Sequence, residues 1–434
     1  MLNNRMLILL VLLYFLPISC GSEIEVEEDI GSKGVFKYNK DNSFTVAYKF
    51  QGEKDYDLVQ FWDYDLQGDL DLIYTFSQVI KVKNIKKTPK ISVGRNDGES
   101  IMAQSSDCIL ATRFNRYPNY SGYLEKDNTY SSGHHALYHN GIFYKTAETK
   151  EVNIKADGRV VKPGETGKAQ TINIIVSTDI YDPFPLIDSI LGNEDPRYEI
   201  IIKEVIDYTI NNGVIDCKVT RDYVKEAFVE TYGGFASMSD GLRFALFPCG
   251  REMENPEWDG FGELIRNIGI NTDECYKKDY PDFNHFVKRN SSATIFESVY
   301  LCPVGIGDHS EIPDDYSIYW VYNGLGQTWK KVYHRLTYQK NFHPGDCQII
   351  ECMYNWFVPV VNTEDYLVYD ILDTRVLDIK HTYSGDMPDD LFNGYNIYKQ
   401  SRNIEISRKD NNSNGVLHID SSQSGSIFWV KSFV

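Results

Sequence analysis

Short runs of β-branched and aromatic residues that end at Asn, Asp, Gly or Pro recur along this chain, and they constrain its fold more than any other feature. Residues 137–144 give the clearest example, because Asn140-Gly141 separates two such runs. Asn-Gly is the preferred dipeptide of a type I′ hairpin turn, in which both central residues have positive φ. The pattern therefore predicts a β-rich domain over residues 34–180.

A second β-rich domain is predicted at the C-terminal end. An aromatic run at residues 319–323 is followed by Gly324 and answered by residues 329–333, which predicts another hairpin. Further runs of the same kind continue to the end of the chain. We therefore expect an aromatic-rich β domain over residues 294–434.

The intervening residues 181–293 carry signals that are typical of helices. Asp195-Pro196 supplies an N-cap followed by Pro at the first helical position, and Gly213 supplies a stop signal. Similar signals predict helices over residues 220–232 and 255–269. The sequence therefore predicts an α+β fold, with β-rich N- and C-terminal regions flanking a helical middle section.

Residues 1–20 have the composition of a secretory signal peptide. A positive charge at Arg5 precedes an apolar run at residues 6–18, which is shorter than the roughly twenty residues that a spanning helix needs. We therefore expect an exported protein that is secreted or displayed at the cell surface. Residues 16–21 resemble a bacterial lipobox, which implies a lipid anchor on Cys20. Ordinary cleavage close to Cys20 is the alternative that the sequence leaves open.

The charge of the chain restricts its partners. Residues 21–33 are rich in Glu and Asp and predict an acidic flexible leader. The whole chain has a formal net charge of −18. A surface this acidic repels polyanions, so we expect no nucleic-acid partner.

Two covalent modifications are expected of an exported chain with this sequence. Six cysteines follow residue 216, so we expect a disulfide framework in the second half. Cys347 and Cys352 are close enough in sequence to predict a local bridge. N-glycosylation triplets begin at Asn119, Asn290 and Asn411, and they are acceptors if the host is eukaryotic.

One acidic string has the residues of a calcium loop. Between Asp63 and Ile73, acidic residues alternate around Gly68. Calcium takes several oxygen ligands from one turn, and a Gly at the sixth position lets the backbone curl around the ion. The string resembles the calcium loop of FG-GAP and related propeller repeats. On that resemblance, the calcium ligands would be Asp63, Asp65, Gln67 and Asp71. A solvated acidic turn between two strands is the alternative.

The aromatic residues give the remaining indication of function. Trp320, Tyr322 and Trp329 cluster across the predicted C-terminal hairpin, and exposed Trp and Tyr suit a sugar ring or a partner protein. No phosphate loop, dinucleotide fingerprint or Gly-x-Ser-x-Gly motif occurs. The sequence therefore predicts a secreted or surface-displayed binding or adhesion protein that recognises a glycan or a protein. The alternative is a secreted hydrolase with an unrecognised active site.

Overall fold

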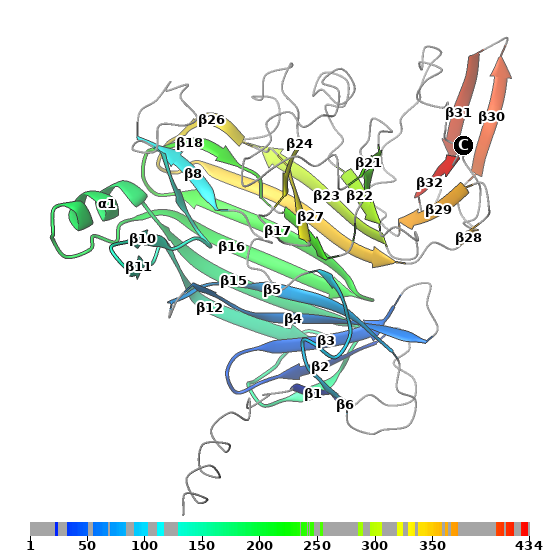
Figure 1. Ribbon diagram of the computed structural model, residues 1–434, viewed down its shortest axis with the longest axis horizontal. Helices are drawn as coiled ribbons and strands as arrows, with labels where there is room; N and C mark the ends of the chain where they lie inside the picture. The colour runs from blue at the N-terminus through cyan, green and yellow to red at the C-terminus, as the bar shows by residue number, and fades with distance from the viewer. Residues whose placement is uncertain are drawn as a thin grey trace, which may run out of the picture.

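Antiparallel strands form most of the regular structure in the computed structural model of this protein (Figure 1). The structure describes residues 22–24, 33–50, 55–67, 70–83, 91–102, 111–116, 129–234, 236–240, 242, 244–246, 252–254, 285–289, 296–305, 319–323, 329–334, 337–357, 361–362, 366–371, 405–411, 414–420 and 427–432.

The larger of two main sheets has ten described strands in the order β13-β12-β15-β16-β17-β27-β23-β22-β20-β21. Their bounds are β13 (Arg159–Val160), β12 (Ala147–Ala156), β15 (Thr171–Tyr181), β16 (Ile200–Asn211), β17 (Val214–Tyr223), β27 (Cys347–Phe357), β23 (Phe296–Gly305), β22 (His285–Arg289), β20 (Phe244–Leu246) and β21 (Glu252–Glu254). Strands from both predicted β domains therefore share this sheet.

The second main sheet has nine described strands in the order β14-β2-β3-β4-β5-β7-β19-β25-β24. Their bounds are β14 (Thr166–Ala169), β2 (Gly34–Tyr38), β3 (Phe44–Lys49), β4 (Tyr56–Gln67), β5 (Leu70–Lys83), β7 (Glu99–Met102), β19 (Ala236–Asp240), β25 (Trp329–His334) and β24 (Tyr319–Asn323).

Smaller sheets complete the described strands. A four-stranded sheet contains β26 (Thr337–Phe342), β18 (Ala227–Tyr232), β8 (Thr112–Asn115) and β9 (Thr129–Ser132). Two pairs are β1 (Ser22–Ile24) with β6 (Ile91–Val93), and β10 (Leu137–His139) with β11 (Ile142–Tyr144). The C-terminal strands are β28 (Val361–Asn362), β29 (Tyr366–Ile371) and β32 (Ile427–Ser432), and the pair β30 (Glu405–Asn411) and β31 (Asn414–Asp420).

The two main sheets pack face to face around one aromatic-rich core. The Trp62 ring of β4 lies 4.9 Å from the Tyr208 ring of β16, and the Phe76 ring of β5 lies 5.0 Å from the Tyr354 ring of β27. Gln60 Nε2 also donates across the interface to the Gly213 carbonyl at 2.7 Å. This arrangement is a β-sandwich, in which side chains from two inner faces interdigitate.

The predicted helical middle section is wrong. The segment predicted as a helix after Asp195-Pro196 contains β16, in which Ile202, Glu204 and Ile206 are buried while the residues between them face outward. That period of two belongs to a strand, and four of the residues at 200–206 are β-branched, which favours a strand further. Residues 220–232 are likewise the end of β17 and β18. The third predicted helix, over residues 255–269, lies outside the described residues.

One helix, α1 (Pro183–Leu191), occurs in the part of the chain that the structure describes, and it lies at one end of the ten-stranded sheet (Figure 1). Its N-cap is Asp182, whose carboxylate accepts a hydrogen bond from the Phe184 amide at 3.0 Å. Pro183 follows at the first helical position, where a missing N–H costs nothing. The capping rule was therefore correct in kind, but the residues that obey it lie about a dozen positions before the predicted ones.

Both predicted Asn-Gly hairpins are confirmed. β10 pairs with β11 around Asn140 (φ 50°) and Gly141 (φ 85°), and β24 pairs with β25. Positive φ at both central residues is the conformation of a type I′ turn. The predicted flexible leader contains β1, which pairs with β6, so three of its residues lie in a strand.

Candidate functional site

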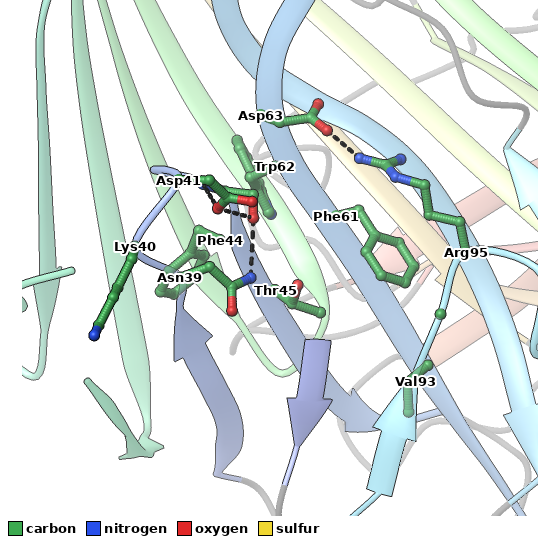
Figure 2. Close-up of a pocket in the computed structure, with 12 residues that line it drawn as sticks. Asn39, Lys40, Asp41, Phe44, Thr45, Phe61, Trp62, Asp63, Val93 and Arg95 are labelled. Atoms are coloured by element: carbon green, nitrogen blue, oxygen red, sulfur yellow. Dashed lines mark hydrogen bonds and ion pairs between the residues drawn. The ribbon is translucent and has the colours of Figure 1, made fainter. Parts of the chain in front are cut away.

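A pocket of about 450 Å³ opens on the nine-stranded sheet beside the turn that joins β2 to β3 (Figure 2). Residues 61–63 of β4 form its floor, the β2–β3 turn forms one wall, and the end of β6 forms the other. Val93 of β6 packs with Phe61 in a hydrophobic cluster on this sheet that is separate from the main core. That packing holds the end of β6 above β4 and brings Arg95 over the floor.

The β2–β3 turn presents a hydrogen-bonded polar edge to this pocket. Asp41 Oδ1 accepts from the Ser43 backbone amide at 3.0 Å and from Ser43 Oγ at 2.7 Å. Asn39 Nδ2 in turn donates to Ser43 Oγ at 2.9 Å (Figure 2). Asp favours such turns because its carboxylate can bond the backbone amide two residues on. The same contacts fix the orientation of the three side chains before any ligand arrives.

Arg95 forms the opposite wall and is held by several partners. Its guanidinium forms an ion pair with Asp63, and its Nη2 also donates to Ser77 Oγ at 2.8 Å. Nη1 donates to Gln78 Oε1 at 3.2 Å. The guanidinium carbon lies 5.0 Å from the centre of the Phe61 ring, within the range of a cation–π contact. Arg95 is therefore a pre-organised donor rather than a mobile surface side chain.

The charges that line this pocket cancel. Lys40 and Arg95 supply two positive charges, and Asp41 and Asp63 supply two negative charges. Lys40 points away from the other three side chains (Figure 2). The pocket therefore offers hydrogen-bond donors and acceptors without a net field that would select an anion or a cation.

The predicted calcium ligands lie on the β4–β5 hairpin. Asp63, Asp65 and Gln67 are residues of β4, Asp71 is a residue of β5, and Leu66 pairs with Asp71. Asp63 carries the ion pair with Arg95. Among the described residues, no group of three His, Cys, Asp or Glu is arranged to hold a metal ion. The segment has extended backbone on both sides of residues 68–69, and calcium binding stays a prediction.

The predicted aromatic ligand-binding residues share an edge of the nine-stranded sheet. Trp320 pairs with Tyr333 and Tyr322 pairs with Lys331, while Trp329 lies two residues before Lys331 on the same strand. Residues that pair directly, and residues two apart, share a face of a sheet. The three positions therefore lie on one face of β24 and β25, several strands away from the pocket.

The predicted bridge between Cys347 and Cys352 does not fit the structure. Both residues belong to β27 and are present as thiols, as is Cys217. Five residues of extended strand span roughly 16 Å, whereas a disulfide needs Cα atoms within about 7 Å. An odd spacing also puts the two side chains on opposite faces of the strand.

The sequence gave no indication of a buried cluster around Arg221, which joins the ten-stranded and four-stranded sheets. Arg221 of β17 is 0% exposed, and its Nε lies 3.1 Å from Glu204 Oε2 of β16. Its Nη1 donates to Gln348 Oε1 at 3.2 Å, and its Nη2 donates to Thr112 of β8. The guanidinium carbon lies 3.7 Å from the centre of the Tyr232 ring. Burial raises the pKa of Glu204, and Arg221 offsets part of that rise.

A second buried polar cluster links the two main sheets. Lys288 Nζ of β22 donates to Ser237 Oγ of β19 at 3.1 Å, and Ser237 donates to Glu297 of β23. Burial lowers the pKa of Lys288 to about 8, and Glu297 opposes that change. A Ser beside such a Lys resembles an activated nucleophile. All three side chains are 0% exposed, however, so they contact no solvent and act as a cross-link.

Several predicted modification sites lie outside the described residues, namely Cys20, Asn119 and Asn290. Asn411 is the last residue of β30. No helix of the described residues is long and apolar enough to cross a membrane.

The pocket was missed because its residues come from three separate segments. Asn39, Asp41 and Ser43 have the composition of an ordinary turn. Arg95 follows Asp63 by 32 residues, and their pairing depends on how β6 packs over β4. Of the predicted site residues, Asp63 alone lines the pocket.

No family model matches this chain, and no curated protein sequence is similar to it. Among solved structures, the GH36 α-galactosidase AgaB from Geobacillus stearothermophilus matches 72% of this chain, at 9% identity and a TM-score of 0.33. This chain spans 39% of that protein's length. Galactose 1-epimerase from Lactobacillus acidophilus NCFM matches 73% of this chain and 98% of its own, at 11% identity and a TM-score of 0.27. These values establish neither a family nor an activity.

Proposed function

We propose that this protein is exported and binds a carbohydrate in the pocket beside the β2–β3 turn. The observation that carries the proposal is the chemistry of that pocket, which has about 450 Å³ of space, fixed polar walls and no net charge. Ligand pockets of small molecules have volumes of about 300 to 1,000 Å³. Export is supported by the apolar run at residues 6–18, which precedes the described structure.

A carbohydrate suits these walls because each of its hydroxyl groups both donates and accepts hydrogen bonds. Asp41 uses Oδ1 for its contacts to Ser43, and Oδ2 makes no contact within the described residues. The second oxygen of Asp63 is likewise outside its ion pair with Arg95. Two carboxylate oxygens on opposite sides of the pocket are therefore placed to accept from ligand hydroxyl groups.

The balance of charge favours a neutral polar ligand over a charged one. Lys40 and Arg95 offset Asp41 and Asp63 in the pocket lining. A lipid or another apolar ligand is disfavoured, because the large apolar side chains of the lining, Phe44, Phe61 and Trp62, are all at least 96% buried. A neutral sugar unit meets both conditions, so we assign the pocket to a saccharide.

The aromatic hairpin of β24 and β25 is a separate predicted contact surface. Trp320, Tyr322 and Trp329 share a face there, which suits stacking against a sugar ring or contact with a protein. Adhesion to a glycan-bearing surface would use both places at once. The proposal for the pocket does not depend on this second surface.

A glycan array followed by calorimetric titration of the bound saccharide tests the proposal. Asp41→Asn and Asp63→Asn remove one charged acceptor each, and we expect about 10- to 100-fold weaker binding, since a hydrogen bond to a charged group contributes about 1.5–3 kcal/mol. Asp195→Asn is the matched control, because Asp195 is exposed and lies outside the pocket. Equal loss of affinity in all three variants, or no saccharide bound by the wild type, would overturn the proposal.

A further inference from the structure

We propose that Cys217 and Cys352 form a disulfide that joins β17 to β27 in the exported protein. The two residues are direct partners in the antiparallel pairing of these strands. Direct partners in an antiparallel pair have Cα atoms about 4.5–5.5 Å apart, and disulfides have Cα atoms about 4.4–6.8 Å apart. The backbone is therefore already at the separation that a bridge requires.

Both side chains also point to the same place. Cys217 is 3% exposed and Cys352 is 0% exposed, and both belong to the core between the main sheets. The two thiols are close enough to hydrogen-bond to each other. Cys347 lies on the other face of β27 and is half-buried, which excludes it as a competitor for either partner.

The position of this pair in the fold gives a bridge a clear consequence. β17 and β27 are neighbours in the ten-stranded sheet (Figure 1), although about 130 residues separate Cys217 from Cys352 in the chain. The bridge would fasten the strand that ends the first half of this sheet to the strand by which the chain re-enters it. A closed loop of this length restricts the unfolded chain strongly.

The chemistry is thiol–disulfide exchange with a disulfide-bearing oxidant of the export pathway. The Cys217 thiolate attacks the oxidant disulfide, which forms a mixed disulfide and releases one oxidant thiol. Cys352 then attacks the mixed disulfide, which forms the protein bridge and releases the second oxidant thiol. Two thiols are oxidised and one disulfide is reduced. Since burial raises the pKa of the Cys217 thiol well above its ordinary value, the exchange must precede closure of the core.

Non-reducing peptide mapping of the full chain, purified after export, tests this proposal. Trypsin with a protease that cuts after Glu351 separates Cys347 from Cys352. We expect a peptide containing Cys217 to be joined to one that begins at Cys352, and Cys347 to be absent from that species. Recovery of Cys217 and Cys352 as alkylated thiols from unreduced, denatured protein would overturn the proposal.

A thermal measurement supplies an independent readout. We expect a reductant to lower the Tm of the wild type to that of the Cys217→Ala/Cys352→Ala variant, and to leave the Tm of that variant unchanged. Cys347→Ala is the control, and its Tm should respond to reductant as the wild type does. A wild-type Tm that is insensitive to reductant would contradict the bridge, and the peptide map decides the matter if the double variant does not fold.

Discussion

Removal of the Arg221 guanidinium should destabilise this protein more than most single substitutions. In Arg221→Met the side-chain volume is largely kept, but the carboxylate of Glu204, which is 2% exposed, loses the cation 3.1 Å away. Breaking a buried ion pair by removing one partner costs about 3–5 kcal/mol, because the remaining charge is uncompensated. We therefore expect the free energy of unfolding to fall by about 4 kcal/mol.

A double-mutant cycle separates the charge from the packing. Glu204→Met alone leaves Arg221 unpaired and should cost a similar amount, so independent effects would sum to about 8 kcal/mol. Replacing both partners leaves no buried charge, and such replacements are often neutral or stabilising. We expect the double variant to lose no more than about 2 kcal/mol, measured by urea unfolding.

The pH dependence of Arg221→Met checks the same cause. Burial raises the pKa of Glu204 above its unfolded value, so the folded state binds the proton more tightly than the unfolded state. The penalty in Arg221→Met is therefore largest near neutral pH and shrinks as the pH falls through the raised pKa. Lys203→Met is the control, since Lys203 is exposed on the same strand. An Arg221→Met variant as stable as this control, or a double variant as unstable as the sum, would refute the reasoning.

Two further predictions concern the nine-stranded sheet. Gly34→Ala should destabilise the protein by about 1–3 kcal/mol in urea unfolding, because a Cβ there would lie 2.4 Å from the buried Tyr48 ring. A stability equal to the wild type would mean that the ring can move. Millimolar calcium should leave the Tm unchanged, because Asp63 already pairs with Arg95 and its neighbours lie on strands. A calcium-dependent rise in Tm that Asp63→Ala abolishes would restore the calcium assignment.

Turn chemistry was the part of the fold that the sequence predicted well. Asn140-Gly141 specifies a type I′ turn through the φ preferences of its own two residues, so no distant contact is needed. Asp-Pro is a weaker signal, because it occurs at both Asp182-Pro183 and Asp195-Pro196 and only the first pair begins a helix. What distinguishes them is the sheet that follows, since β16 gains its partners β15 and β17 from the tertiary structure.

The candidate site was less predictable than the turns. Asp63 was singled out for calcium because its neighbours in sequence are acidic, whereas its partner in the structure is Arg95 on another segment. Cys352 was assigned to Cys347 by proximity in sequence, whereas its cross-strand partner is Cys217. In both cases the relevant neighbour is set by strand register and sheet packing, which local sequence patterns do not encode.

Amide hydrogen exchange of the wild type, with and without the saccharide that the array identifies, tests the location of binding most directly. If the pocket holds the ligand, exchange should slow at residues 39–45 and 93–95, which line it, and should stay unchanged at the β12–β13 turn around Asp157-Gly158. Protection confined to residues 319–334, or protection at neither segment while the saccharide is bound, would contradict the assignment of this pocket as the carbohydrate site.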